Sequence, residues 1–477
     1  MDQELFDREI ASQAENVDAN VPSSARRLPL AFRPPPPARP RYRAFGPRQL
    51  HRIAPLAALS TETRFAMEVV AAVLPFRVNA YVIDELIDWT RVPDDPIFQL
   101  TFPQRGMLED DQFQRVAGAL RRKAPAAELD AIVGAIRADL NPHPAGQQSH
   151  NVPELEGERL AGLQHKYPET VLFFPSQGQT CHAYCTFCFR WAQFIGDQDL
   201  KFADPETGRL VRYLATHPEV SDVLITGGDP MVMKTRTLAR HVEPLLHPSL
   251  GHLRNIRIGS KALTFWPHRF VSDPDADDLL RLLEKIVQAG KHVAFMAHLN
   301  HPRELSTPVA ERAVRRIRAT GAVIRAQAPL LAHINDDPSV WAELWRREVD
   351  LGIVPYYMFV ERDTGARRYF EVPLVEAHRI HREARRRVSG LARTARGPSM
   401  SAGPGKVEIQ GLATIAGEEV MVLRFIQARE LDWVQRPFFA ARDDAATWLD
   451  HLRPAFGEPS FFFEPLYRER YGARSLR

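Results

Sequence analysis

The chain has 477 residues, 44% of them hydrophobic and 25% charged, as in ordinary globular proteins, and this length predicts one large domain with appendages or two domains. A formal net charge of +3 gives no indication of a nucleic-acid-binding surface. Three cysteines leave no disulfide scaffold, the N-terminus lacks a secretory apolar run, and no apolar stretch is long enough to span a bilayer, so we expect a cytoplasmic protein without a membrane partner.

The first third of the chain divides into two regions. Residues 1–45 are polar and then proline-rich, which predicts a disordered arm that could also cross to a partner subunit. Residues 46–165 form a helical region by their apolar spacing, which is clearest at 63–82 and 111–140. Between those two stretches, residues 94–103 are predicted to be a connecting loop.

From Tyr167 onward, short apolar runs alternate with helix-like segments. The clearest of these helices is 273–289, with one apolar face. Parallel strands need crossover connections, so the pattern predicts a parallel α/β sheet covered by helices. Six units rather than eight favour an open, partial (β/α)6 barrel over residues 166–395, with its functional loops at the carboxyl ends of the strands. The six predicted strands are 171–174, 223–226, 256–259, 292–296, 323–327 and 354–359.

The only cysteines, Cys181, Cys185 and Cys188, follow the first predicted strand. Iron–sulfur clusters are held by cysteine thiolates, and three thiolates leave one iron of a [4Fe–4S] cluster without a protein ligand. The alternatives are a zinc site with His182 as fourth ligand, or three unrelated core thiols. The spacing, with Phe187 before the last cysteine, resembles the radical S-adenosylmethionine (SAM) superfamily, in which SAM chelates the open iron.

Other candidate residues follow the later strands. Gly227, Gly228 and Asp229 come after the second strand, where glycines let a ligand approach the backbone, and the superfamily resemblance implies contact with the methionyl amino group of SAM. Alone, this run is equally a turn signal. Three polar side chains at the next strand ends are candidate cofactor ligands: Ser260, His298 and Gln327. The histidine and the glutamine could instead cap a neighbouring helix.

Residues 396–477 read as a small C-terminal cap. They begin with a glycine- and proline-rich loop that carries Lys406, one of only eight lysines, and a lysine on a stiff loop suits a Schiff-base amine as well as an exposed position. Residues 419–426 are predicted to be a strand and 445–452 a helix. The aromatic run 459–464 is a candidate contact in a homo-oligomer.

Together these pieces resemble the lysine 2,3-aminomutase family of radical SAM enzymes from about residue 94 to residue 425. The resemblance implies pyridoxal 5′-phosphate (PLP) as a further cofactor, and an amino group that moves between Cα and Cβ of an amino acid. It also implies that Lys406 bonds PLP, that Arg190 holds the substrate α-carboxylate, and that Lys166 and Tyr167 lie by the PLP phosphate. It rests on these runs: Asp95-Pro-Ile, His165-Lys-Tyr-Pro168, the cysteine loop, Gly227-Gly-Asp229, Arg257-Ile-Gly-Ser260, His298-Leu-Asn-His-Pro302, Gln327, Leu330–Asp336, Pro355-Tyr-Tyr357 and Gly403-Pro-Gly-Lys406.

Three departures from the family pattern bear on the substrate and on PLP. Arg362 and Ser399 stand where lysine-specific members have acidic residues, although Asp363 is adjacent, so we expect a substrate with an acidic or neutral side chain rather than lysine. Thr170 replaces an arginine that helps to hold the PLP phosphate. The additional zinc-binding cysteines of some members are absent, and we expect no structural zinc.

Two other functions compete with the aminomutase. One is a radical SAM enzyme without PLP that acts on another substrate, such as a peptide or protein side chain. The other is a non-catalytic cluster protein, a sensor or a scaffold. For either enzyme we expect an electron donor of the flavodoxin or ferredoxin type.

Overall fold

The computed structural model describes residues 40–142, 151–196 and 202–472. Most of the predicted arm, residues 1–39, lies outside the described residues, and residues 41–477 form one structural unit. The last residues of the predicted arm belong to that unit, because strand β1 (Ala44–Phe45) pairs with β2 (Val78–Asn79) and Phe45 is buried.

The six strands predicted from residue 167 onward are confirmed. They lie in chain order in one sheet, and each pairs in parallel with the next. Among the described residues the sheet has eleven strands and runs in order from β5 (Leu163–Tyr167) to β15 (Pro437–Ala441). The six strands are β6 (Thr170–Phe173), β7 (Asp222–Ile225), β8 (Asn255–Ser260), β9 (His292–His298), β10 (Val323–Leu330) and β11 (Val354–Val360).

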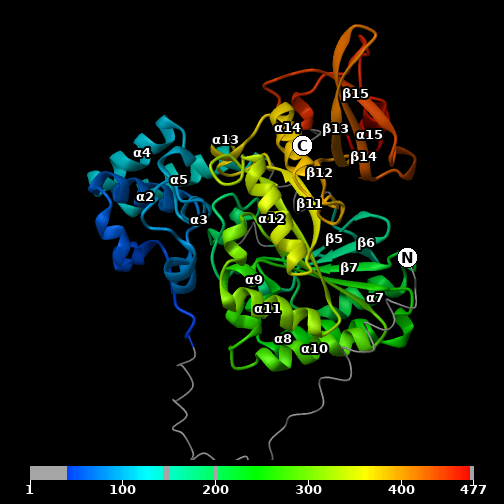
Figure 1. Cartoon of the computed structure of the whole chain (residues 1–477), viewed down its shortest axis with the longest axis horizontal. Coiled ribbons are helices and arrows are strands. Elements are labelled where there is room, and N and C mark those ends of the chain that lie inside the picture. Colours follow the sequence, from blue (N-terminus) through cyan, green and yellow to red (C-terminus); the bar gives the residue numbers. More distant parts are fainter. Residues whose placement is uncertain (1–39, 143–150, 197–201, 473–477) are drawn as a thin grey trace, which may run out of the picture. The chain divides into compact units, whose positions relative to one another are not determined.

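Helices connect these strands, and α8, α10 and α11 lie together along one side of the sheet (Figure 1). The predicted helix 273–289 is α10, which buries Leu279, Leu283 and Ile286 in the core. No helix in the described ranges has the length and apolar character needed to cross a bilayer. The connecting helices are α7 (Thr207–Ala215), α8 (Thr235–Val242), α9 (Ala262–Phe265), α10 (Ala276–Gln288), α11 (Pro308–Ala319), α12 (Pro338–Asp350), α13 (Arg367–Phe370) and α14 (Leu374–Arg386).

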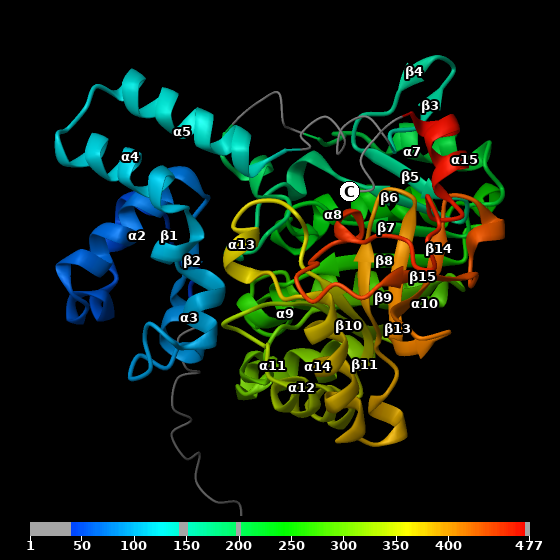
Figure 2. The same ribbon diagram turned by 90° about the horizontal axis from the view of Figure 1, so that it is seen from above.

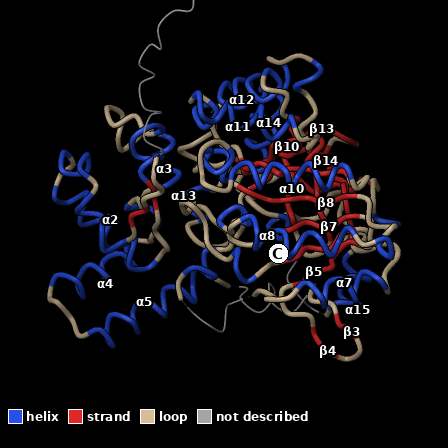
Figure 3. Tube along the Cα trace, turned by 90° about the horizontal axis from the view of Figure 1, so that it is seen from below, coloured by secondary structure: helices blue, strands red, loops and turns tan. Residues whose placement is uncertain are grey.

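The region before β5 is mostly helical, and its hydrophobic core is shared with the cysteine loop and with the segments after β8, β10 and β11. Helices α2, α4 and α5 form a group beside the sheet (Figure 3). The predicted connecting loop at 94–103 is wrong, because it contains a buried helix, α3 (Pro96–Thr101). The remaining elements are α2 (Thr61–Val73), α4 (Asp110–Arg121), α5 (Ala126–Leu140), β3 (Glu154–Leu155) and β4 (Glu158–Arg159).

The C-terminal cap continues the same sheet (Figure 2). Its first strand pairs in parallel with β11, and the strands after it pair antiparallel. The predicted stiff loop at 396–406 is instead the start of a hairpin of β12 (Arg396–Ser401) and β13 (Gly405–Ile415), and the strand predicted at 419–426 is confirmed as β14 (Glu418–Ala428). Helix α15 (Glu464–Tyr471) packs on this hairpin region through Tyr467.

The helix predicted at 445–452 is wrong. Only Leu449–His451 form a short helical turn. The carbonyl of Ala446 accepts a hydrogen bond from the first amide of α14, that of Leu374, at 2.8 Å, and Trp448 is buried in the core of the cap. These contacts with distant parts of the chain replace the local helical hydrogen bonds.

Candidate active site

The three cysteines face one cavity of about 620 Å³, called the central cavity below. Cys181, Cys185 and Cys188 are free thiols of intermediate exposure. Burial raises the pKa of all three thiols, to about 11 for Cys188. The carboxylate of Asp229, and then the neighbouring thiols, raise the pKa of Cys181 further. Thiols this close together become thiolates when a cationic metal centre compensates their charge, so the donor set fits an iron–sulfur cluster.

The alternative is a zinc ion held by the three cysteines with His182 as the fourth ligand, all around one ion. His182 lines the central cavity, and its ring lies edge-on to that of Tyr42 with 5.5 Å between centroids. Among the described residues, no group of three or more His, Cys, Asp or Glu side chains, the three cysteines and His182 included, is arranged around a single metal ion as a zinc site would be.

The cysteine loop is held from behind by the N-terminal region. The amide of Thr186 donates to the carbonyl of Leu100 at 3.0 Å, and its hydroxyl donates to the carbonyl of Gln99 at 2.8 Å. Both carbonyls belong to α3, whose first turn is capped by the buried carboxylate of Asp95. The sequence carried a signal for this helix, because an aspartate followed directly by proline marks a helix N-terminus.

The glycine-rich loop after β7 packs directly against the cysteine loop. A Cβ atom on Gly228 would lie 2.5 Å from both the backbone nitrogen and the carbonyl oxygen of Thr180. The φ angle of Gly227 is +153°, a conformation that side chains disfavour. Both glycines line the central cavity. The two loops therefore touch at a point where only glycine fits.

Asp229 and Ser260 bind to one another instead of standing free. The Ser260 hydroxyl donates to both carboxylate oxygens of Asp229, at 2.8 and 3.0 Å, and the amide of Lys261 donates to the carboxylate at 2.9 Å. Burial raises the pKa of Asp229 to about 6. The pair ties the loops after β7 and β8 together at the cavity wall.

The later strand ends contribute polar side chains to the same cavity. His298 and Gln327 both line it, and burial lowers the pKa of His298 to about 3, which keeps the imidazole neutral. The Lys261 ammonium forms a buried ion pair with Glu304 at 2.6 Å and also donates to the side chain of Asn300 at 2.8 Å. The sequence did not indicate this pair, although Lys261 is one of few lysines.

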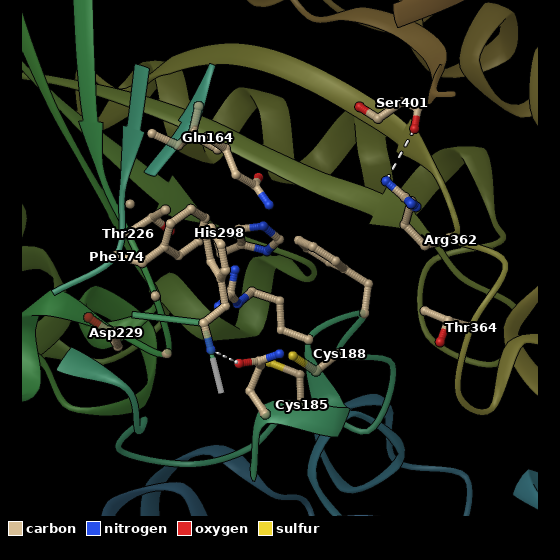
Figure 4. A pocket seen from close by; sticks show the side chains of 18 of the residues that line it. Gln164, Phe174, Cys185, Cys188, Thr226, Asp229, His298, Arg362, Thr364 and Ser401 are labelled. Atoms are coloured by element: carbon tan, nitrogen blue, oxygen red, sulfur yellow. Dashed lines mark hydrogen bonds between the residues drawn. The ribbon is translucent and has the colours of Figure 1, made fainter. Parts of the chain in front are cut away.

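Three cations predicted from the sequence also line the cavity: Lys166, Arg190 and Arg362. The guanidinium of Arg190 lies 4.2 Å from the ring centroid of Phe174, its Nε is buried without a hydrogen-bond partner, and burial lowers its pKa to about 10. The guanidinium of Arg362 lies 5.7 Å from the ring centroids of both Phe189 and Trp448. In Figure 4, Arg362 and Asp229 are on opposite sides of the cavity, with Cys185 and Cys188 between them in the view.

Three other predicted residues, Lys406, Tyr167 and Ser399, are not among the described residues that line the cavity. Ser399 is fully buried in β12, and Ser401 lines the cavity instead. Lys406 is paired with Ser401 across the hairpin, and directly opposed residues of antiparallel strands share a face of the sheet. The side chains of Lys406 and Ser401 are therefore on the same face of the sheet.

The environment of Lys406 suits a reactive amine. Its ammonium lies 4.2 Å from the ring centroid of Tyr357 and donates to the side chain of Gln427 at 3.2 Å. Burial, together with the nearby guanidinium of Arg396, lowers the pKa of Lys406 to about 7. A lysine with this pKa is largely neutral, and hence nucleophilic, slightly above neutral pH.

Comparison with known proteins identifies relatives that are named as lysine 2,3-aminomutases. A "Putative L-lysine 2,3-aminomutase" of Aquifex aeolicus is 33% identical over 390 residues, which is 82% of this chain and 90% of that protein. The L-lysine 2,3-aminomutase of Fusobacterium nucleatum is 29% identical over 50% of this chain and 53% of its own length. No family model matches the chain.

The solved structures that resemble the chain are more distant. A radical SAM methyltransferase from Sphaerobacter thermophilus has 17% identity and a TM-score of 0.37, covering 61% of this chain and 88% of that one. Streptococcus suis SuiB bound to S-adenosylmethionine has 14% identity and a TM-score of 0.33, covering 57% and 56%. The extent and identity of the Aquifex match decide the relationship: the chain belongs to the lysine 2,3-aminomutase family of radical SAM enzymes.

Proposed function

We propose that the protein is a PLP-dependent 2,3-aminomutase that acts on an amino acid with an acidic or neutral side chain. The observation that carries the proposal is one cavity that contains the three thiols, the paired loops after β7 and β8, and the cations Lys166, Arg190 and Arg362. We further propose that β6–β11 form a partial (β/α)6 barrel, and that the protein is a cytoplasmic homo-oligomer with a flavodoxin- or ferredoxin-type electron donor.

The cofactors would occupy different parts of the cavity. Cys181, Cys185 and Cys188 would hold the cluster, and the residues after β7 to β10 would line the SAM site. Lys406, which is paired with the cavity-lining Ser401, would bond PLP. When bound, the cluster and SAM supply a carbon radical that removes a hydrogen atom from Cβ, and PLP supplies the conjugated group on which nitrogen moves between Cα and Cβ. The residues of the chain bind and orient the substrate.

Arg190 is suited to the α-carboxylate of the substrate. Its guanidinium is packed on Phe174 and its Nε has no hydrogen-bond partner, so a carboxylate would gain a charge-assisted hydrogen bond with little rearrangement. His298, kept neutral by burial, adds no competing positive charge to the same cavity. The buried rings of Phe174 and Phe187 line the cavity and would limit the access of water to a radical.

Arg362 determines the expected side-chain preference. Its guanidinium is held by the carbonyl of Ser401 at 3.1 Å and by two aromatic rings, and it lies 3.8 Å from the carboxylate of Asp363. A substrate ammonium placed here would meet a fixed cation. A carboxylate or a neutral polar group would meet hydrogen-bond donors.

The experiment is a kinetic panel of lysine, glutamate, aspartate and neutral amino acids, read by deuterium transfer from Cβ into 5′-deoxyadenosine. We expect Arg362→Ala to lower kcat/KM for the best acidic substrate by about 10- to 100-fold, the loss of one charge-assisted hydrogen bond. Arg368→Ala is the matched control, because Arg368 pairs with Glu109 on the surface. A preference for lysine, combined with an unaffected Arg362→Ala variant, would contradict the proposal.

A radical SAM enzyme without PLP remains the second candidate, and the position of Lys406 outside the cavity lining favours it. Borohydride reduction of PLP-treated protein followed by peptide mapping separates the two. A pyridoxyl group on Lys406 supports the aminomutase. SAM cleavage without any such adduct supports the second candidate.

A further inference from the structure

Three cationic side chains donate hydrogen bonds to the turn between β12 and β13. The consecutive carbonyls of residues 401–403 each accept a hydrogen bond from a different cation: the first from Arg362 at 3.1 Å, the second from the ammonium of Lys166, and the third from the Nε of Arg429 at 2.9 Å. These cations come from the ends of β11, β5 and β14, which are far apart in the sequence. All three line the central cavity.

Within the part of the chain that the structure describes, two of these cations have no carboxylate partner. Arg362 has Asp363 at 3.8 Å, whereas neither Lys166 nor Arg429 is in a salt bridge with any of the described residues. Burial, then the charges of Arg429 and Arg362, lower the pKa of Lys166 well below its usual value. Two like charges held close together at the wall of a cavity are unfavourable until an anion neutralises them.

The family resemblance already implies that Lys166 lies by the PLP phosphate. We infer that Arg429, from the C-terminal cap, is a second phosphate-binding residue, and that it completes with Lys166 a site for a phosphate monoester. A phosphate monoester carries about −1.5 to −2 charges at neutral pH, which matches two uncompensated cations better than a single carboxylate does. The residues beside them are neutral donors and acceptors, because Asn151 and Gln164 line this part of the cavity and Asn151 accepts a hydrogen bond from Arg429.

The inference rests on the proposed function, because PLP is the phosphate monoester that the aminomutase would use. It also gives the C-terminal cap a role. The guanidinium of Arg429 lies 4.8 Å from the ring centroid of Tyr471 on α15, and the adjacent Glu430 pairs with Arg470 of the same helix at 2.6 Å. Helix α15 thus positions the end of β14, and with it the second cation of the site.

The test measures binding of PLP, pyridoxal and inorganic phosphate to the full-length protein by absorbance and by equilibrium dialysis. We expect PLP to bind at least about 10-fold more tightly than pyridoxal, with inorganic phosphate competing. Arg429→Gln should weaken PLP binding by about 10- to 100-fold and leave pyridoxal unchanged, and Arg429→Lys should recover part of the loss. Arg442→Gln, a surface arginine of the same cap paired with Glu419, should match the wild type.

The outcomes of this test separate a wrong phosphate site from a wrong proposed function. If Arg429→Gln binds PLP like the wild type, or if pyridoxal binds as tightly as PLP, the phosphate site is wrong while the proposed aminomutase stands. If the wild-type protein binds neither PLP nor phosphate, both the site and the PLP-dependent function are wrong. SAM cleavage by the same preparation would then point to the enzyme without PLP. Circular dichroism of each variant establishes that it is folded.

Discussion

Asp95 supports the cysteine loop from a distance, and its replacement should loosen the cluster site. Its carboxylate accepts hydrogen bonds from the amides of Ile97 at 3.0 Å, Phe98 at 2.8 Å and Asp88 at 3.1 Å, and it is fully buried. In Asp95→Ala all three amides lose their acceptor. Helix α3, whose last turn accepts the hydrogen bonds from Thr186, loses its N-terminal cap.

The expected magnitude follows from these bonds. A lost helix cap costs about 1–2 kcal/mol and a further buried unsatisfied amide about 1–3 kcal/mol, so Asp95→Ala should lower the free energy of unfolding by about 3 kcal/mol. Asp95→Asn keeps one acceptor oxygen and should lose about 1 kcal/mol. Asp337→Ala is the matched control, because Asp337 caps α12 with the same chemistry at an exposed position that is not part of the cavity lining.

The assays are urea unfolding and the loss of iron to a chelator under anaerobic conditions. Asp95→Ala should release iron about 10-fold faster than the wild type, because a frayed α3 frees the cysteine loop. Asp337→Ala should release iron at the wild-type rate. An Asp95→Ala variant with wild-type stability and wild-type iron retention would refute the role of α3.

Two further changes test the packing of the loops and the state of Lys406. Gly228→Ala should abolish cluster retention in an iron and sulfide assay, because its Cβ would lie 2.5 Å from backbone atoms of Thr180. The control is Gly208→Ala, whose Cβ would have no atom within 4 Å. This variant should be as stable as the wild type or more stable by up to about 1 kcal/mol. The pKa of Lys406 is lowered to about 7, so above pH 7 the folded protein loses this proton before the unfolded chain does, and the stability contributed by Lys406 rises with pH. Relative to Lys406→Met, the wild type should gain up to about 1 kcal/mol per pH unit between pH 7.5 and 9.5 in urea unfolding, and parallel pH profiles would contradict a depressed pKa.

The strands of the sheet could be predicted because their signal is local. Each buried parallel strand is a short apolar run followed by a polar segment, and all six were located to within a few residues. The cysteine spacing is equally local. Hence the cavity-lining positions of Gly227, Gly228, His298 and Gln327 could be anticipated from their places at strand ends.

What the sequence could not provide depends on contacts between distant segments. Arg429 has no motif around it, and it reaches the cavity only because β14 returns beside β13 and α15 holds its end. The Lys261–Glu304 pair joins the loops after β8 and β9. Likewise, Ser399 was assigned to the substrate by alignment, but the hairpin of β12 and β13 buries it and presents Ser401.

The most direct test of the radical mechanism is the response of the reduced cluster to SAM. In anaerobically reconstituted protein, we expect the electron paramagnetic resonance spectrum to change on addition of SAM and 5′-deoxyadenosine to form under reduction, because three cysteines leave one iron without a protein ligand. A reduced cluster whose spectrum is indifferent to SAM, with no 5′-deoxyadenosine formed, would show that a side chain fills the fourth position and would contradict the mechanism.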